Sequence, residues 1–505
     1  MPRIFDCAAI RTSLAPCFSW LWRARGKESS FNGLLLSVPA VESVPGNLNS
    51  GFNRLKQGAN ETITRHGLSF CAGPLLSVAA LVLASHISFG AQMLSLQEAH
   101  TLALQRNPRI SIAQLQVLTA QEIRKEARAA YFPTLTANAT AVGTSDENTR
   151  IAAGALNNPA IFDRNAEGLI LSQLITDFGR TANSVAGARL RVSAAKQNER
   201  ATQEELLLAV DAAYFGVLNA TSIREVAKQT IETRDLTMNQ VSTLASNKLR
   251  SELDVNFAKV NLDEGKLLLL RAENENASAL TRLSTLLGYQ EPQAFQLIEE
   301  PLPPPASSNV DQLVQIALLH RPDLERLRLE GEASKHYAKA EHAANYPTLS
   351  AVGSAGVIPA GDPTFRKDYA AAGLNLSIPL FEGGLYQARA REFDLRVNIA
   401  VQKLKEAEDN AVRDVRIAWL STQEGFERLR VTEALLRHAA EAYDLAEERY
   451  KLGTVSIIEL SQAQLNKTAA QIASVSARYE YQLQLSRLAF ETGTANKRET
   501  ENRLH

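Results

Sequence analysis

The sequence contains two copies of one unit, and this duplication constrains the fold more than any other feature. The segment Phe132–Leu135 (FPTL) recurs 214 residues later as Tyr346–Leu349 (YPTL). Further along, Ser251–Asp254 matches Ser456–Glu459 at a spacing of 205 residues. A loss of about nine residues between two strand-like segments accounts for the change in spacing. Two copies of one supersecondary unit that differ mainly in one loop indicate a duplicated structure.

Each copy is predicted to contain one very long helix. No proline occurs from 180 to 246 or from 385 to 452, and at 1.5 Å per residue each helix would be a rod of roughly 100 Å. Shorter helices are expected before the strands and after the long helix, the latter over about 252–287 and 457–492. The two shorter helices together match the long one in length. We therefore expect each long helix to pack beside two shorter helices laid end to end.

Local signals mark where the first helices of each copy begin. Ser95 and Asn309 each stand three positions before Glu or Gln, which is the spacing of a helix capping box. Pro108 and Pro322 are placed to start the next helix, where the missing N–H of proline costs nothing. Both copies are therefore predicted to open on two consecutive helices.

Two alternating segments in each copy predict strands. Every second residue of 134–141 is apolar, and Leu374 and Leu376 alternate with polar neighbours. The strands would be about ten residues long, the length of a tilted strand that crosses a bilayer, with polar loops near 143–165 and 358–368. Taken alone, they fit a pair of soluble hairpins equally well. Aromatic residues at the strand bases would suit a membrane interface: Tyr131, Phe132, Phe178, Tyr346 and Phe381.

Four membrane strands cannot close a barrel, because an open edge would expose unpaired backbone groups to lipid. Small membrane barrels begin at about eight strands. The chain must therefore contribute its four strands to a shared barrel, and three copies would give twelve strands. The helices would then form a hollow cylinder below the barrel.

Three motifs resemble the TolC-like outer-membrane efflux and secretion channels, also called outer membrane factors. They are Leu376–Gly384 (LSIPLFEGG), its weaker counterpart Leu171–Gly179 (LSQLITDFG) and Tyr450–Thr454 (YKLGT), and the resemblance covers residues 94–493. It implies a mainly α fold with membrane β-strands, built from a duplicated helix–strand–strand–helix unit. It also implies a homotrimer in outer-membrane lipid, with a twelve-stranded barrel continuous with a long periplasmic helical barrel.

The resemblance further implies a passive exit duct of a tripartite efflux or type I secretion system. Such a duct is connected through a periplasmic adaptor (membrane fusion) protein to an inner-membrane transporter. The cargo stays open between drugs, metals, metabolites and polypeptides. The alternative from another class is a soluble periplasmic coiled-coil scaffold, which shares the long helices but leaves the paired strands unexplained.

The turns after the two long helices form the periplasmic tip in this family. Gly453 is expected to end its helix in the left-handed conformation. Lys248 replaces that glycine in the first copy, so Asn247 is expected to take the left-handed role there. The residues expected to meet the adaptor are Lys248, Leu249, Arg250, Gly453, Thr454 and Val455.

Asp254, Glu459 and Tyr450 match positions at which the family places its periplasmic gate. In a trimer the two acids would bring six carboxylates to one axis, and such a ring attracts cations. The alternative is that each acid only caps a helix, because each stands third after a serine. Val455 occupies a position where some members carry arginine, so closure is expected to depend on packing.

The composition and motifs argue against other functions. Lys+Arg 54 and Asp+Glu 55 leave a net charge of -1, which gives no basic field for nucleic acid. The sequence has no His/Cys cluster with metal spacing, no phosphate-binding loop and no nucleophile elbow. We therefore predict no enzyme activity, no cofactor and no metal site.

The N-terminal region predicts export. Arg65 and His66 precede an apolar run over 75–84 and small residues near 88–91, the layout of a signal peptide. Cys71 follows the bulky Phe70, so lipidation is not expected. Translation is expected to start downstream of residue 1, with residues 1–64 outside the signal peptide and the repeats. The predicted divisions are 1–64, an unassigned extension; 65–91, the signal peptide; 94–288, the first repeat; 289–308, a proline-rich linker; 309–493, the second repeat; and 494–505, a polar tail.

Overall fold

The computed structural model describes residues 92–142, 152–153, 156–157, 164–305, 309–360 and 366–495. Contacts divide the chain into Met1–His86 and Ile87–His505, and all described residues belong to the second unit. The predicted extension, the signal peptide, Cys71 and nearly all of the polar tail lie outside the described residues.

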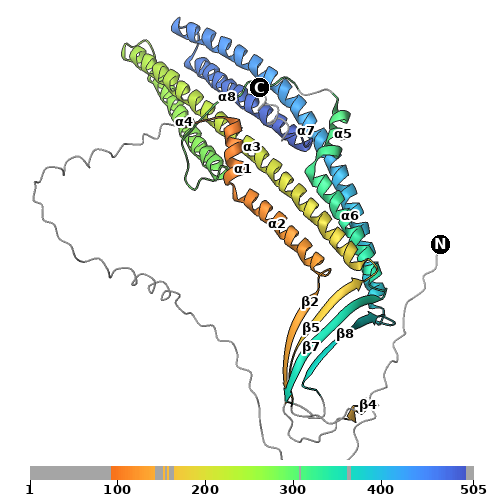
Figure 1. Cartoon of the computed structure of the whole chain (residues 1–505). Coiled ribbons are helices and arrows are strands. Elements are labelled where there is room, and N and C mark those ends of the chain that lie inside the picture. The colour runs from red at the N-terminus through yellow and green to blue at the C-terminus, as the bar shows by residue number, and fades with distance from the viewer. Residues whose placement is uncertain are drawn as a thin grey trace, which may run out of the picture. The chain divides into compact units, whose positions relative to one another are not determined.

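The helices confirm the predicted pattern (Figure 1). The two long ones, α3 (Arg180–Ser246) and α7 (Leu385–Lys451), each contain 67 residues. The others are α1 (Leu96–Arg106), α2 (Pro108–Ala129), α4 (Glu252–Leu286), α5 (Val310–His320), α6 (Pro322–Ala343) and α8 (Ile457–Glu491).

Each long helix packs beside shorter ones, as predicted. Helix α3 contacts α2 along one part and α4 along another, and α7 does the same with α6 and α8. Helix α3 also contacts α6 and α8, which joins the two copies. Among the described helices, only α3 includes an 18-residue stretch apolar enough to cross a bilayer, and half of that stretch is buried. Its contacts with five other described helices identify it as a core helix.

The predicted helix starts are present. The Ser95 hydroxyl accepts a hydrogen bond from the Glu98 N–H at 3.3 Å, and the Glu98 carboxylate accepts one from the Ser95 N–H at 2.9 Å. Asn309 Oδ1 accepts from the N–H of Gln312 at 3.2 Å. Pro108 and Pro322 occupy the first turns of α2 and α6.

The four predicted strands form one antiparallel sheet in the order β2-β5-β7-β8. Their bounds are Thr134–Val142, Arg164–Thr176, Thr348–Ala360 and Asp368–Ser377. The central pairing of β5 with β7 joins the two copies. Strands β2 and β8 are the outer strands, and their described residues are exposed on both faces. Among the described residues, no layer therefore covers the outer strands of the sheet.

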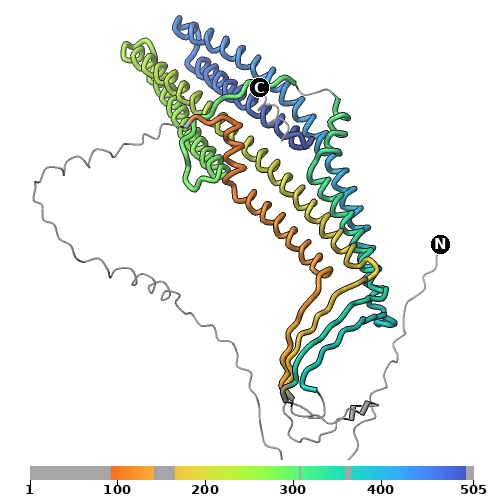
Figure 2. Tube along the Cα trace, in the orientation of Figure 1, coloured from red at the N-terminus to blue at the C-terminus, as the bar shows by residue number. Residues whose placement is uncertain are grey.

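Each edge of the sheet continues into a helix. Figure 2 shows α2 leading into β2 on one side and β8 leading into α7 on the other. Four minor strands complete the described structure: β1 (Gln92–Leu94) pairs in parallel with β6 (Phe295–Leu297), and β3 (Ala152–Ala153) pairs with β4 (Leu156–Asn157).

The largest buried cluster lies where the β1–β6 ribbon crosses α3. Tyr214 is fully buried there, and its hydroxyl lies 3.0 Å from the Leu94 carbonyl and 2.6 Å from that of Ile298. Leu206, Leu283 and Phe295 belong to the same cluster. One side chain of α3 thus fixes segments that precede and follow the first repeat.

Candidate functional site

The turn after α7 has glycine in the left-handed position, as predicted, directly after the C-cap Leu452. Gly453 has φ +75°, its N–H donates to the Tyr450 carbonyl at 3.0 Å, and the Thr454 N–H donates to the Arg449 carbonyl at 3.0 Å. This is the Schellman pattern, in which the residue after the C-cap is left-handed.

The turn after α3 has the same pattern without glycine. The Lys248 N–H donates to the Ala245 carbonyl, and the Leu249 N–H donates to the Leu244 carbonyl, both at 2.9 Å. Lys248 itself is left-handed with φ +59°, whereas Asn247 has φ -85°. The prediction that Asn247 takes the left-handed role was therefore wrong. The two hydrogen bonds fix the left-handed position one residue after the C-cap, and Asn247 is the C-cap.

Arg250 connects the turn of the first copy to the end of the long helix in the second. Its Nη2 donates to the Tyr450 carbonyl at 3.2 Å, and its guanidinium carbon lies 4.5 Å from the centre of the Tyr450 ring. This geometry is a cation–π contact. Arg250 therefore links the two turns rather than extending freely towards a partner.

Tyr450 belongs to a buried group at this end of the helices, which we call the tip cluster. Its buried members are Val241, Ala258, Tyr443, Tyr450, Ile457 and Leu460. Val455 packs against them. Burial raises the pKa of the Tyr450 hydroxyl, while Arg250 lowers it. The cluster packs the two turns together within one chain, while closure of a gate by packing stays a prediction.

The two predicted gate acids occupy first turns of helices. Asp254 and Ser251 form a complete capping box, with N–H to oxygen distances of 3.2 and 3.3 Å. At the start of α8, the Ser456 hydroxyl accepts a hydrogen bond from the Glu459 N–H at 3.3 Å. The reciprocal bond, from the serine N–H to the carboxylate, forms at the start of α4 but not at the start of α8. The Glu459 side chain is exposed. Capping thus accounts for Asp254 and leaves the Glu459 carboxylate accessible, while the gate role stays a prediction.

The outer surface of the tip is partly apolar. Leu249 is 69% exposed and Leu452 is 78% exposed, and Lys248, Gly453 and Thr454 are exposed beside them. Leu452 was absent from the predicted docking residues. An apolar residue at the C-cap, next to a left-handed glycine, is the signal that could have identified it.

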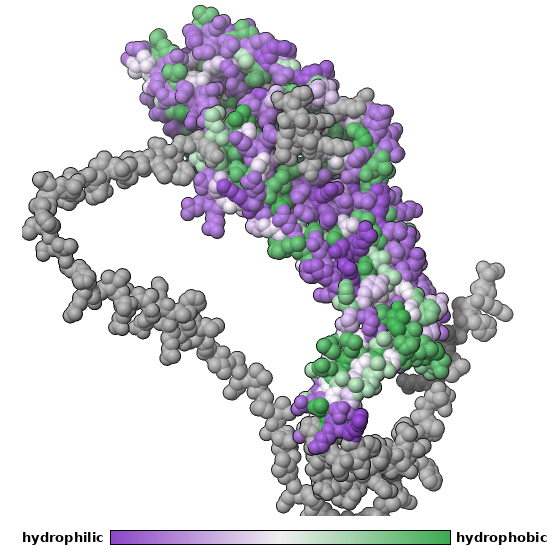
Figure 3. All heavy atoms as spheres, viewed as in Figure 1, coloured by the Kyte–Doolittle hydropathy of each residue, from purple (hydrophilic) through white to green (hydrophobic). Residues whose placement is uncertain are grey.

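The five predicted interface aromatics lie at the end of the sheet next to the helices. All are exposed, from 45% for Tyr131 to 87% for Phe381. Phe178 and Tyr346 contact each other with ring centres 6.2 Å apart. Figure 3 shows apolar side chains gathered over the sheet and the adjoining helix ends. This distribution favours the membrane-interface role, which remains a prediction.

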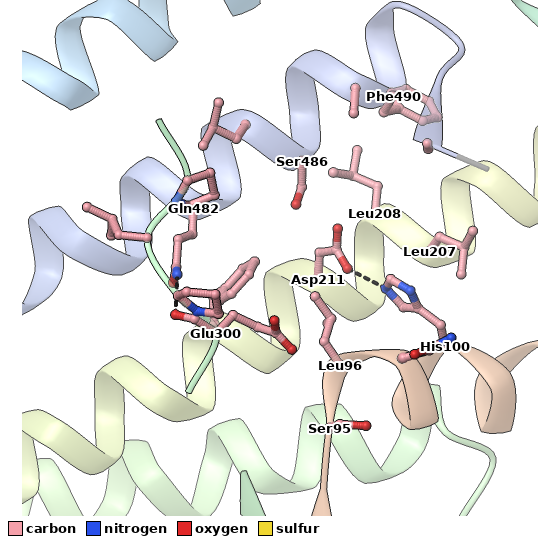
Figure 4. A pocket seen from close by; sticks show the side chains of 18 of the residues that line it. Ser95, Leu96, His100, Leu207, Leu208, Asp211, Glu300, Gln482, Ser486 and Phe490 are labelled. Atoms are coloured by element: carbon pink, nitrogen blue, oxygen red, sulfur yellow. Dashed lines mark hydrogen bonds and ion pairs between the residues drawn. The ribbon is translucent and has the colours of Figure 1, made fainter. Parts of the chain in front are cut away.

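A cavity of about 810 Å³ lies between α1, α3, α8 and residues 300–304 (Figure 4). His100 Nε2 lies 2.5 Å from Asp211 Oδ1, and Gln482 Nε2 donates to the Glu300 carbonyl at 3.2 Å. Much of the remaining wall is apolar. Across the described ranges, no group of three or more His, Cys, Asp or Glu side chains is placed to hold a metal ion.

Comparison with known proteins identifies relatives that match most of the described residues. The family described as outer membrane efflux protein matches residues 100–289 and 313–494. Outer membrane protein TolC of Salmonella enteritidis is 22% identical over 307 residues, which are 59% of this chain and 62% of that protein. The pyoverdine export outer membrane protein OpmQ of Pseudomonas aeruginosa is 28% identical over 309 residues, 59% of this chain and 62% of OpmQ.

A longer match is the alkaline protease secretion protein AprF of Pseudomonas aeruginosa. It is 24% identical over 423 residues, which cover 81% of this chain and 86% of AprF. The chain thus spans about three-fifths of TolC and OpmQ but most of AprF. The fold matches a crystal structure of CusC with a TM-score of 0.69 at 20% identity, covering 79% of this chain and 92% of CusC.

Proposed function

The chain belongs to the outer membrane efflux protein family, and we propose that it forms the exit duct of a tripartite export system. Membership confirms the resemblance to TolC-like channels and the assignment to the outer membrane. The observation that carries the proposal is an open four-stranded sheet, with outer strands exposed on both faces, that continues directly into two helices of 67 residues.

The sheet edges support a homotrimer. Strands β2 and β8 have no outer neighbour among the described strands, and unpaired backbone groups cost several kcal/mol each in lipid. Pairing β2 of one copy with β8 of the next satisfies both edges. Three copies then close a twelve-stranded barrel, which is above the minimum of about eight strands.

The helices offer matching edges. Helix α2, which leads into β2, exposes Ile112, Leu115 and Leu118 at helical spacing. Helix α7, which follows β8, exposes Leu395 and Ile399 one turn apart. The two apolar rows lie on different edges of the chain, so they form a head-to-tail interface that closes into a ring.

The turns at the tip are the proposed contact with a periplasmic adaptor, which would connect the duct to an inner-membrane transporter. Leu249, Leu452 and Thr454 present an exposed surface of apolar and small polar groups. The duct is a passive conduit in this proposal, with no catalytic residue and no cofactor. The scaffold alternative leaves the doubly exposed sheet without a function.

The cargo class is the open part of the proposal. The name of OpmQ links that relative to export of pyoverdine, and the name of AprF links that relative to secretion of an alkaline protease. AprF is matched over more of both chains, which favours a polypeptide cargo. Loss of an extracellular protein from a deletion strain, with unchanged small-molecule resistance, would support it.

Assembly is the direct test of the channel itself. The detergent-extracted protein should appear in negative-stain electron microscopy as a three-fold hollow particle longer than about 100 Å. The double variant Leu395→Glu, Ile399→Glu should yield monomers, whereas Lys405→Glu, an exposed site on the same helix, should leave the trimer intact. Wild-type protein that is monomeric, or that carbonate removes from membranes, would contradict the proposal.

A further inference from the structure

The cavity of about 810 Å³ lies at the junction of the two copies, and we call it the junction cavity. Helices α1 and α3 of the first copy form one side, α8 of the second copy forms another, and residues 300–304 of the linker complete the wall (Figure 4). Ligand pockets in proteins are typically about 300–1,000 Å³ in volume. The junction cavity therefore has the size of a site for a small organic molecule.

The linker wall of the junction cavity is held in place from both copies. The hydroxyl of Tyr214, from α3, lies 2.6 Å from the Ile298 carbonyl. The hydroxyl of Tyr481, from α8, donates to the Pro304 carbonyl at 3.1 Å, and the Glu300 carbonyl accepts from a side-chain amide of α8 at 3.2 Å. The backbone on either side of Glu300 is thus fixed before any ligand binds, and such preorganisation lowers the cost of binding.

The lining of the junction cavity is acidic. Its described residues include two carboxylates, Asp211 and Glu300, and neither lysine nor arginine. Figure 4 shows Asp211 and His100 pointing toward each other, and both side chains are 12% exposed, so water reaches them. Glu300 is half-buried, and its carboxylate forms no hydrogen bond or ion pair with the described part of the chain. Whether His100 is neutral or protonated, the lining keeps at least one uncompensated negative charge.

Much of the remaining lining is apolar. Leucines and phenylalanines of three helices contribute to it: Leu96, Leu207, Leu208, Phe215, Leu485 and Phe490. A carboxylate beside such a low-dielectric space attracts a cation more strongly than a carboxylate in water does. An anion would be repelled by the same charge, and a neutral molecule would leave Glu300 uncompensated. The lining therefore favours a molecule that carries a positive charge on an apolar body.

We propose that the junction cavity binds an apolar organic cation of the quaternary ammonium or phosphonium type. Glu300 compensates its charge, and the leucines and phenylalanines pack against its apolar groups. Asp211 adds to the negative potential of the cavity while it keeps its pair with His100. Because the ligand contacts α3 and α8, it also links the two copies. The inference depends on the fold of one chain, so its failure would leave the proposed exit duct intact.

Isothermal titration calorimetry on the full chain in a non-ionic detergent tests the proposal, with a titration into detergent alone subtracted. The probes are tetraphenylphosphonium and tetraphenylborate, which have nearly the same shape and opposite charges. We expect saturable binding of one tetraphenylphosphonium per chain and no saturable binding of tetraphenylborate. Glu300→Gln should weaken the binding of tetraphenylphosphonium about tenfold or more, the loss expected for one charge-assisted contact.

Two further variants sharpen the test. Leu302→Lys adds a positive charge to the lining at a position that is 39% exposed, and it should weaken binding by a similar factor. Glu291→Gln removes an exposed carboxylate of the same linker outside the lining, so this matched control should bind like wild type. Absence of saturable binding to the wild-type chain, equal affinity for the two probes, or unchanged affinity in Glu300→Gln or Leu302→Lys would each overturn the proposal.

Discussion

The guanidinium of Arg250 lies 4.5 Å from the centre of the Tyr450 ring and donates a hydrogen bond to the carbonyl of the same residue. One side chain therefore holds the start of α4 against the end of α7, although the two residues are 200 positions apart in sequence. Because Tyr450 is also part of the tip cluster, the contact joins surface turns to a packed interior.

Removal of the Arg250 side chain should loosen the tip. Arg250→Ala loses a cation–π contact and a charge-assisted hydrogen bond, which together contribute about 2 kcal/mol. We expect a higher single-channel conductance in planar bilayers than for the wild-type channel. Arg449→Ala, which alters an exposed arginine one residue before Tyr450, is the control. Conductance equal to wild type in Arg250→Ala would show that the contact does not restrict the duct.

Lys248 carries a backbone cost that glycine would remove. A non-glycine residue in the left-handed region costs roughly 1–2 kcal/mol, and the added freedom of glycine in the unfolded chain cancels part of that gain. Lys248→Gly should therefore stabilise the protein by about 0.5–1 kcal/mol in chemical denaturation. Gly453→Lys, the reverse change in the matching turn, should destabilise it by a similar amount. A destabilising Lys248→Gly would mean that the lysine side chain makes a stabilising contact of its own.

Much of the fold could be predicted because its signals are local. The proline-free stretches marked α3 and α7 nearly to the residue. Ser95 and Pro108 marked helix starts through a capping hydroxyl and a missing N–H, and Gly453 marked a helix end because glycine readily adopts the left-handed conformation. The alternating segments predicted the strands, and both Leu374 and Leu376 lie in β8.

The contacts between the two copies could not be predicted. The contact of Arg250 with Tyr450 was not predicted, because packing between distant segments leaves no periodic pattern in the sequence. The role of Arg250 in meeting an adaptor stays a prediction. The left-handed conformation of Lys248 was missed for a related reason. Residue preference favoured Asn247, whereas the hydrogen bonds of the complete turn determine which position must be left-handed.

A pair of facing glycines in the sheet should be intolerant of side chains. Gly356 of β7 is paired with Gly168 of β5, and a Cβ at Gly356 would collide with the Glu167 carbonyl oxygen and with the Tyr369 hydroxyl. We expect Gly356→Ala to reduce the amount of assembled protein in the outer membrane. Gly373→Ala, in β8 with open space around its Cβ, should assemble normally. Equal membrane levels of the two variants would contradict the described strand packing.

The acidic pair should control block by multivalent cations. If Asp254 and Glu459 approach one axis in the trimer, replacing both with alanine should weaken conductance block by a trivalent cation about tenfold or more, since several charges of the ring are lost together. Glu252→Ala removes a carboxylate from the same first turn of α4 and serves as the control. Unchanged block in the double variant would leave the two residues with capping alone.

Glu204 should make stability depend on pH. This carboxyl of α3 is 7% exposed. Burial, with repulsion from Asp323, raises its pKa from 4.5 to about 7 against the opposing effect of Arg321 and Arg200. Arg321 is itself paired with Asp323 at 3.0 Å and with Glu491 at 2.8 Å, so its charge is already compensated.

The direction in which stability changes with pH follows from proton binding by Glu204. Between about pH 4.5 and 7 the folded chain holds a proton at Glu204 that the unfolded chain releases, so the contribution of Glu204 to stability falls as the pH rises through this range. The loss reaches up to about 3 kcal/mol above pH 7, at 1.36 kcal/mol per pKa unit. Glu204→Gln keeps the shape but cannot ionise. We expect its denaturation midpoint to exceed that of wild type at pH 8 and to match it near pH 4.5. A wild-type advantage at pH 8 would show that the ionised carboxylate is stabilised in the folded chain.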